Sequence, residues 1–174
     1  MFSFRTTPLD QQPDIVLAKG NVGVLCNQVA WNPEKGEYLF ETLHRGGNLK
    51  KVFVPTEELE GYAALNLEGC EFIPMEEMVE NLSGIDAIIV ELQEIGTRYT
   101  PIIDLMGALF GTIHQQGLEI SVYVLDRENP TGRCVEGTMG SLGIPHRHGL
   151  TLGEIANMFH TETGAKFPLH IISY

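Results

Sequence analysis

The sequence lacks the signatures of several common cofactor and metal sites. It has no Gly-x-x-x-x-Gly-Lys-Ser/Thr stretch, and Asn27, not a glycine-rich turn, follows the first hydrophobic run. Its three cysteines show no Cys-x-x-Cys spacing, so neither a disulfide framework nor a zinc site is indicated, and Cys26 and Cys70 are predicted to be buried, reduced thiols. His146 and His148 flank an arginine, an unfavourable neighbour for a cation. We therefore predict no cofactor and no bound metal.

Positive charge and long apolar runs are also scarce. Eleven Lys and Arg residues stand against 23 Asp and Glu residues, and the formal charge of -12 repels phosphate backbones and anionic membranes. No run approaches the roughly 18 apolar residues of a membrane span. Residues 1–8 contain no apolar segment after a charged one, as an export signal would. We expect a soluble, cytoplasmic protein with no nucleic-acid and no membrane partner.

Short apolar runs alternate with helical patterns along the 174 residues, a length that suits a single domain over 1–174. Strands are predicted at 22–26, 52–54, 71–73, 85–90, 120–125 and 169–172. Helical patterns are predicted near 38–43, 75–82, 102–113 and 151–159. Strands that alternate with helices indicate an α/β fold of three layers, with a doubly wound, mostly parallel sheet.

Local signals mark the ends of two of these helices. Thr100 is predicted to cap the helix that starts at Pro101 and ends at Gly117. Thr151 and Glu154 form a capping box at the start of the last helix. The stretch 127–149 is long for a connection and is predicted to be a functional loop.

Polar residues gather where the predicted strands end. They comprise Asn27 and Gln28 after the first strand, Glu57 and Glu58 after the second, the segment Glu91 to Tyr99, and the segment Asp126 to Asn129. The carboxyl ends of parallel strands meet at one edge of a sheet, where ligands bind. No serine or cysteine nucleophile lies beside a base, whereas several carboxylates among amides suit carbohydrate chemistry.

Each of these candidates also has a structural explanation. Glu91 and Glu94 could form a solvated face, although a carboxylate that closes an apolar strand favours a functional role. Asp126 and Arg127 could instead pair to fix a turn. Arg147 and His148 could instead satisfy loop carbonyls. Glu57 and Glu58 could be ordinary surface charges.

Taken together, these segments resemble the NamZ-type exo-β-N-acetylmuramidase family of glycoside hydrolases, long known as a domain of unknown function. The resemblance lies in the order and spacing of five segments: Cys26-Asn27-Gln28, Glu91 to Tyr99, Leu125 to Pro130, Val135-Glu136-Gly137, and Arg147 to Glu154. It implies a Rossmann-like N-terminal domain that forms one wall of a cleft. It also implies release of non-reducing terminal N-acetylmuramic acid from peptidoglycan fragments.

The sequence departs from the family pattern at three places. The family's second-strand motif, Ser-Pro-Glu-His-Gly, carries the glutamate proposed for catalysis, and here Thr56 stands at that position. A one-residue shift would let Glu57 take the role, since threonine cannot act as a general acid. Glu91 and Glu94 replace two aspartates of the pattern. The family also continues into a C-terminal domain after the strand that matches 169–172, whereas this sequence ends at Tyr174, and we expect a partner chain or a second copy to complete the cleft.

The resemblance gives each candidate a role. The predicted catalytic carboxylates are Glu57, Glu91, Glu94 and Asp126. Arginines would bind the lactyl carboxylate of muramic acid, and amides would bind ring hydroxyls and the acetamido group. The predicted substrate-binding residues are Asn27, Gln28, Gln93, Arg98, Tyr99, Arg127, Asn129, Arg147 and His148.

Three functional hypotheses follow. The first is a hydrolase or receptor for amino-sugar or muramyl ligands. The second is a non-catalytic relative that binds a ligand or a protein partner. The third is an unrelated flavodoxin-like domain that binds another small metabolite, which the missing phosphate loop disfavours.

Overall fold

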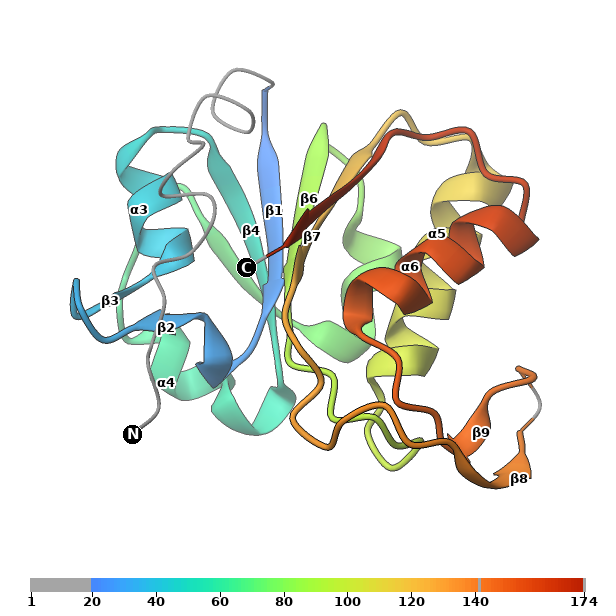
Figure 1. Cartoon of the computed structure of the whole chain (residues 1–174). Coiled ribbons are helices and arrows are strands. Elements are labelled where there is room, and N and C mark those ends of the chain that lie inside the picture. Colours follow the sequence, from blue (N-terminus) through green and yellow to red (C-terminus); the bar gives the residue numbers. More distant parts are fainter. Residues whose placement is uncertain (1–19, 141, 174) are drawn as a thin grey trace.

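A six-stranded parallel sheet lies at the centre of the molecule (Figure 1). The computed structural model describes residues 20–140 and 142–173. All five strand pairings of this sheet are parallel. In spatial order the strands are β10 (Leu169–Ser173), β7 (Ser121–Asp126), β6 (Ala87–Glu91), β1 (Val22–Cys26), β4 (Leu49–Val54) and β5 (Glu71–Pro74).

The strand order reverses next to β1. The chain runs from β1 outward through β4 to β5, then crosses to the other side of β1 and continues through β6 and β7 to β10. Such a reversal opens a crevice at the carboxyl ends of the two central strands, here β1 and β6.

Helices cover both faces of the sheet and make three layers (Figure 1). One face carries α3 (Leu39–Arg45) and α4 (Leu59–Ala63), and the other carries the 3-10 helix η3 (Met75–Asn81), α5 (Ile102–Gln116) and α6 (Leu152–Glu162). Phe40 is buried in the first interface and Phe110 in the second. The predicted fold class, a three-layer α/β arrangement of the Rossmann type, is confirmed.

Short elements connect these layers. They are η1 (Gln28–Ala30), β2 (Trp31–Asn32), β3 (Glu37–Tyr38), η2 (Thr56–Glu58), β8 (Glu136–Met139) and β9 (Pro145–Arg147). The stretch predicted as an irregular functional loop therefore contains an antiparallel hairpin, β8–β9. Thr97 bridges to Arg147 on the other side of β9.

Most of the predicted helix ends match the structure. Gly117 ends α5 in the left-handed conformation at φ 61°, and the capping box of Thr151 and Glu154 opens α6. Thr100 does not cap α5, because Pro101 occupies the cap position without a side-chain hydrogen bond. The segment after β5 is a 3-10 helix and not the predicted helical pattern of period 3.6. A 3-10 helix also aligns residues three apart, so Met75 and Met78 are both buried.

The cysteines are free and differ in exposure. Cys26 is buried, as predicted, whereas Cys70 is half-buried and Cys134 is exposed. Burial raises the pKa of the Cys26 thiol well above its usual value, and the nearby Glu91 raises it further. Burial also raises the pKa of Cys70, to about 11.

Among the described residues, no helix is both long and apolar enough to cross a membrane. Residues 1–8, on which the expectation of no export signal rests, lie outside the described part of the chain.

Candidate functional site at the carboxyl edge of the sheet

The structure brings the predicted residues to one edge of the sheet, as parallel pairing requires. Cys26 at the end of β1 is the register partner of Glu91 at the end of β6. The turns that follow β1, β4, β6 and β7 lie along the lower border of the molecule in Figure 1. We call this border the carboxyl edge.

A buried ion pair occupies the centre of the carboxyl edge. The Glu91 side chain has no exposed surface, and its Oε1 lies 2.6 Å from Nη2 of Arg127. Nη1 of Arg127 donates to the carbonyl of Val29 in η1, at 3.3 Å. The guanidinium therefore links the turn after β7 to the end of β6 and to η1, the turn after β1. The sequence suggested Asp126 as the partner of Arg127, and the structure gives Glu91 instead.

Asp126 holds the start of α6. Its carboxylate accepts hydrogen bonds from the Thr151 hydroxyl, at 3.1 Å, and from the Gly153 amide, at 2.8 Å. A Cβ on Gly153 would lie 2.7 Å from the Asp126 carboxyl carbon, so only glycine allows this approach. A negative charge at a helix N-terminus is favourable. In the structure, the Asp126 carboxylate thus anchors a helix.

The loops on the β7 side of the ion pair form a dense network, which we call the bonded half (residues 93–98, 128–131 and 146–150). Glu94 Oε1 accepts from the Gly96 amide at 2.6 Å. Asn129 donates to the Leu150 carbonyl at 3.1 Å and accepts from the Thr131 amide at 3.0 Å. The Gln93 amide nitrogen donates to the carbonyls of residues 94 and 128. These side chains form hydrogen bonds with backbone N–H and C=O groups that would otherwise lack a partner.

Glu94 and His148 form a buried pair inside the bonded half. The Leu150 amide donates to Nδ1 of His148 at 3.1 Å, so the neutral ring carries its proton on Nε2, which lies 3.4 Å from Glu94 Oε1. Burial raises the pKa of the Glu94 carboxyl. Burial, and then the positive charge of Arg98, lower the pKa of His148. Both shifts favour the uncharged forms.

The remaining predicted residues of this side hold the β8–β9 hairpin. Arg98 donates to the Thr138 carbonyl at 2.9 Å and lines a small cavity of about 150 Å³. Arg147 donates to Glu136 at 3.2 Å and to the Thr131 carbonyl at 2.7 Å. Tyr99 is 79% exposed.

A cavity of about 390 Å³ lies on the β4 side of the ion pair. We call the residues that line it the open half: Gln28, Tyr38, Glu57, Glu58, Gly61, Tyr62 and Leu65. The turn η1 after β1 carries Gln28, and its N-cap, Asn27, accepts from the Val29 amide. The turn η2 after β4 carries both glutamates. Of the predicted residues, Gln28 and Glu57 therefore line this cavity and Asn27 adjoins it.

The two glutamates of the open half differ in their partners. Glu58 accepts a hydrogen bond from the Tyr62 hydroxyl at 3.0 Å, and burial together with this bond raises the pKa of Tyr62. Glu57 is exposed on η2. Thr56, which stands at the family's glutamate position, donates its hydroxyl to Glu76 at 2.8 Å. Glu57, the next residue, is the one that lines the cavity.

The sequence analysis did not predict the aromatic cluster beside the cavity, which we call the aromatic wall: Trp31, Tyr38, Phe40 and Tyr62. The ring of Tyr38 stacks on Phe40 at 5.0 Å and meets Tyr62 and Trp31 edge-on, at 5.2 and 5.0 Å. These residues lie on β2, β3, α3 and α4, so their proximity is a tertiary feature. A signal was present in Trp31, the one tryptophan of the sequence, three residues after Gln28.

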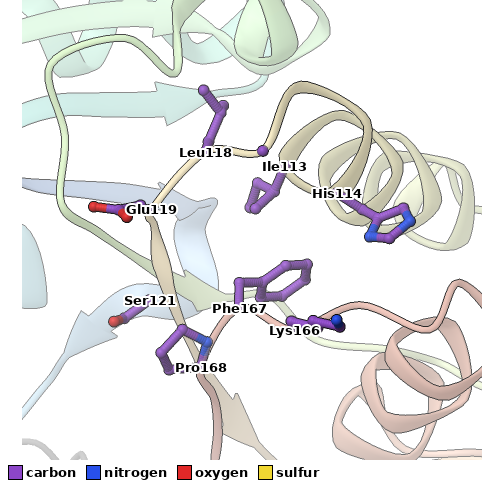
Figure 2. A pocket seen from close by; sticks show the side chains of 9 residues that line it. Ile113, His114, Leu118, Glu119, Ser121, Lys166, Phe167 and Pro168 are labelled. Carbon is purple, nitrogen blue, oxygen red and sulfur yellow. The ribbon is translucent and has the colours of Figure 1, made fainter.

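A larger cavity, of about 650 Å³, lies at the opposite edge of the sheet (Figure 2). Ser121 at the start of β7 and Pro168 just before β10 line it, so it belongs to the amino ends of the strands. Ligands of open α/β sheets bind outside the carboxyl ends. Despite its smaller volume, the cavity of the open half is therefore the better candidate.

The described residues contain no cluster of three or more His, Cys, Asp or Glu side chains that could hold a metal ion. The functional groups at the carboxyl edge are carboxylates, amides, guanidinium groups and aromatic rings.

The chain is similar to known proteins in sequence and in fold. A protein of Bacillus subtilis (strain 168), the peptidoglycan β-N-acetylmuramidase NamZ, is 30% identical over 126 residues, which are 67% of this chain and 29% of that protein. Two DUF1343 family proteins of Bacteroides fragilis have the same fold. One has a TM-score of 0.76 at 24% identity over 99% of this chain and 50% of its own. The other has a TM-score of 0.78 at 22% identity over 94% of this chain and 49% of its own.

The chain thus spans about half the length of the two solved relatives and matches less than a third of the Bacillus protein. The model of the family described as exo-β-N-acetylmuramidase NamZ, N-terminal, matches residues 22–174. On this evidence the chain belongs to the NamZ N-terminal domain family.

Proposed function

We propose that this chain binds a muramyl sugar of peptidoglycan in the cavity of the open half. The observation that carries the proposal is the composition of this cavity, which is lined by Gln28, two glutamates and two tyrosines near the carboxyl ends of β1 and β4. Amides and carboxylates bind hydroxyl and acetamido groups, and aromatic rings pack against the apolar face of a pyranose. A family relative named as a peptidoglycan β-N-acetylmuramidase supports the choice of sugar.

The orientation of the sugar follows from charge. Glu57 and Glu58 repel the lactyl carboxylate of muramic acid, so this group must point away from η2. Arg127 contacts η1, the turn that carries Gln28, and is partly exposed. In the proposed complex the lactyl group lies toward Arg127 and the acetamido group lies against Gln28.

Within this proposal, Glu57 is the candidate proton donor for glycoside cleavage. A general acid must reach the leaving oxygen, and Glu57 is exposed and lines the cavity. Glu91 is fully buried against Arg127, Glu94 is buried, and Asp126 is bound to the start of α6. Their predicted catalytic roles would require these contacts to break.

The engagement of these three carboxylates favours a second candidate function, which is binding without turnover. The two functions differ in one measurable property, the hydrolysis of a bound muramide.

The test combines calorimetric titration with an activity assay. N-acetylmuramic acid should bind more tightly than N-acetylglucosamine, which lacks the lactyl group. A chromogenic N-acetylmuramide should be hydrolysed between pH 4 and 8, and Glu57→Gln should lower the rate by about 100-fold or more. Glu60→Gln is the matched control, because Glu60 is an exposed neighbour in α4 that does not line the cavity.

Binding of N-acetylmuramic acid without hydrolysis at any pH would establish the second candidate. If neither sugar binds, both candidates fail.

A further inference from the structure

Trp31 lies next to two residues that line the cavity of the open half. It directly follows η1, and its amide donates to the carbonyl of Gln28, which lines the cavity. Its ring lies 5.0 Å from that of Tyr38, another lining residue, at an interplanar angle of 70°. The residue is nevertheless 45% exposed. A large, solvent-exposed aromatic surface therefore lies beside residues that line the cavity.

The position of Trp31 is fixed by its surroundings. Trp31 pairs with Tyr38 across the β2–β3 hairpin. The side chain of Asn32 accepts from the amides of residues 34 and 35 and so fixes the hairpin turn. Tyr38 is itself stacked on Phe40, which is fully buried. The tryptophan is thus anchored through the aromatic wall to the core, and its exposed surface is preorganised for binding.

We propose that Trp31 is a stacking platform for a second sugar ring, the one linked to the muramyl residue in the cavity. This inference rests on the proposed function and adds the preferred ligand length, since the domain would bind a disaccharide unit in preference to a single sugar. The indole covers the apolar face of the second ring while its hydroxyls stay in water. Stacking also removes exposed aromatic surface from solvent, which is favourable.

Trp31 provides its own assay because it is the one tryptophan of the sequence. Titration with a muramyl disaccharide, N-acetylmuramic acid linked to N-acetylglucosamine, should shift the emission to shorter wavelength and saturate. N-acetylmuramic acid alone should bind, as measured by calorimetry, and leave the emission nearly unchanged. For a protein that hydrolyses the disaccharide, the titration is made with Glu57→Gln.

Variants separate stacking from other effects. By calorimetry, Trp31→Ala should weaken disaccharide binding about fivefold and leave monosaccharide binding unchanged. Trp31→Phe should recover most of the loss. Met139→Ala is the control, because Met139 is a large apolar residue with still greater exposure that lies in β8 and does not line the cavity. It should leave both affinities unchanged.

The possible outcomes distinguish this inference from the function on which it rests. Equal affinities for the two ligands, both insensitive to Trp31→Ala in a folded variant, would overturn the platform and leave the muramyl site standing. Absence of binding by either ligand would overturn both. A fivefold loss confined to the disaccharide would support both.

Discussion

The two halves of the carboxyl edge use similar residues in opposite ways. In the bonded half, Glu94 and Asn129 are buried and hydrogen-bonded to loop backbone. In the open half, Gln28 and Glu57 are exposed and border a cavity. The bonded half contains several carboxylates and amides, yet the cavity of about 390 Å³ lies in the open half. A high density of carboxylates and amides therefore indicated a hydrogen-bonded loop network more strongly than it indicated a cavity.

The difference follows from the lengths of the connections. The segments 92–101 and 127–151 are long, and much of their backbone forms neither helix nor strand. Their buried N–H and C=O groups need side-chain partners. The connections after β1 and β4 are 3-10 turns that satisfy their backbone locally, which leaves Gln28 and Glu57 unengaged by such bonds in the described network.

The largest expected effect is at the boundary between the halves, where Arg127 contacts both η1 and β6. Arg127→Met leaves the Glu91 carboxylate buried without its guanidinium. We expect a loss of about 3–5 kcal/mol in the free energy of unfolding, measured by urea denaturation. The double variant with Glu91→Gln should recover part of this loss. If Arg127→Met lowers the free energy of unfolding by less than about 1 kcal/mol, the ion pair is not needed to hold the two halves together.

The next largest effects are expected from glycine-to-alanine substitutions, which should change the free energy of unfolding in opposite directions in the two halves. Gly96 has φ +79°, and a Cβ there would overlap Asn129 Nδ2 and lie 2.6 Å from Thr131 Oγ1. Gly96→Ala should therefore lower the free energy of unfolding by about 2 kcal/mol or more. In the open half, Gly61 lies in α4 with no atom within 4 Å of an added Cβ. Gly61→Ala should instead stabilise by up to about 1 kcal/mol. Equal effects of the two substitutions would contradict the comparison.

The buried Glu94 gives the bonded half a pH dependence. Burial raises the pKa of this carboxyl above its ordinary value of 4.5, so the folded state binds the proton more tightly than the unfolded state. The protonated Glu94 carboxyl therefore contributes to the stability of the folded state below pH 4.5, and this contribution is lost as the pH rises through the pKa of Glu94 in the folded state. Glu94→Gln keeps the acceptor for the Gly96 amide and does not titrate.

The stability of Glu94→Gln relative to wild type should therefore increase between pH 4 and pH 7, measured by denaturation at each pH. A difference that stays constant with pH would show that Glu94 is not proton-linked to folding.

The smallest expected effect comes from a matched pair of glutamines. Gln28→Ala should lower the affinity for N-acetylmuramic acid by about fivefold and change the free energy of unfolding by less than about 0.5 kcal/mol. Gln93→Ala removes bonds to the carbonyls of residues 94 and 128, and should cost about 1 kcal/mol of stability with little change in affinity. Calorimetry and denaturation of both variants test this, and a reversed pattern would move the site to the bonded half.

Local sequence signals predicted the framework well. The strand at Val22–Cys26, the end of α5 at Gly117 and the capping box at Thr151 depend on short-range chemistry, and the structure matches all three. Parallel pairing then predicted that the strand ends would meet, which Cys26 and Glu91 show.

Features that depend on long-range packing were not predictable from the sequence. The cap of α5, the 3-10 form of η3 and the β8–β9 hairpin were missed because tertiary contacts decide among similar local conformations. The partner of Arg127 was missed because two carboxylates were available. Tyr38 and Tyr62 are distant in sequence, and only the packed aromatic wall shows that they share a cavity. The roles of the nine binding and four catalytic candidates stay predictions.

The unequal exposure of the three thiols has a practical consequence for these experiments. Cys26 is sealed within the central sheet and Cys70 is half-buried, whereas Cys134 is exposed before the β8–β9 hairpin. Because a thiol must be accessible to react, a maleimide dye at neutral pH should label Cys134 first. A fluorophore there and Trp31, which lies next to the open half, would form a donor–acceptor pair across the carboxyl edge without any residue being added to the chain.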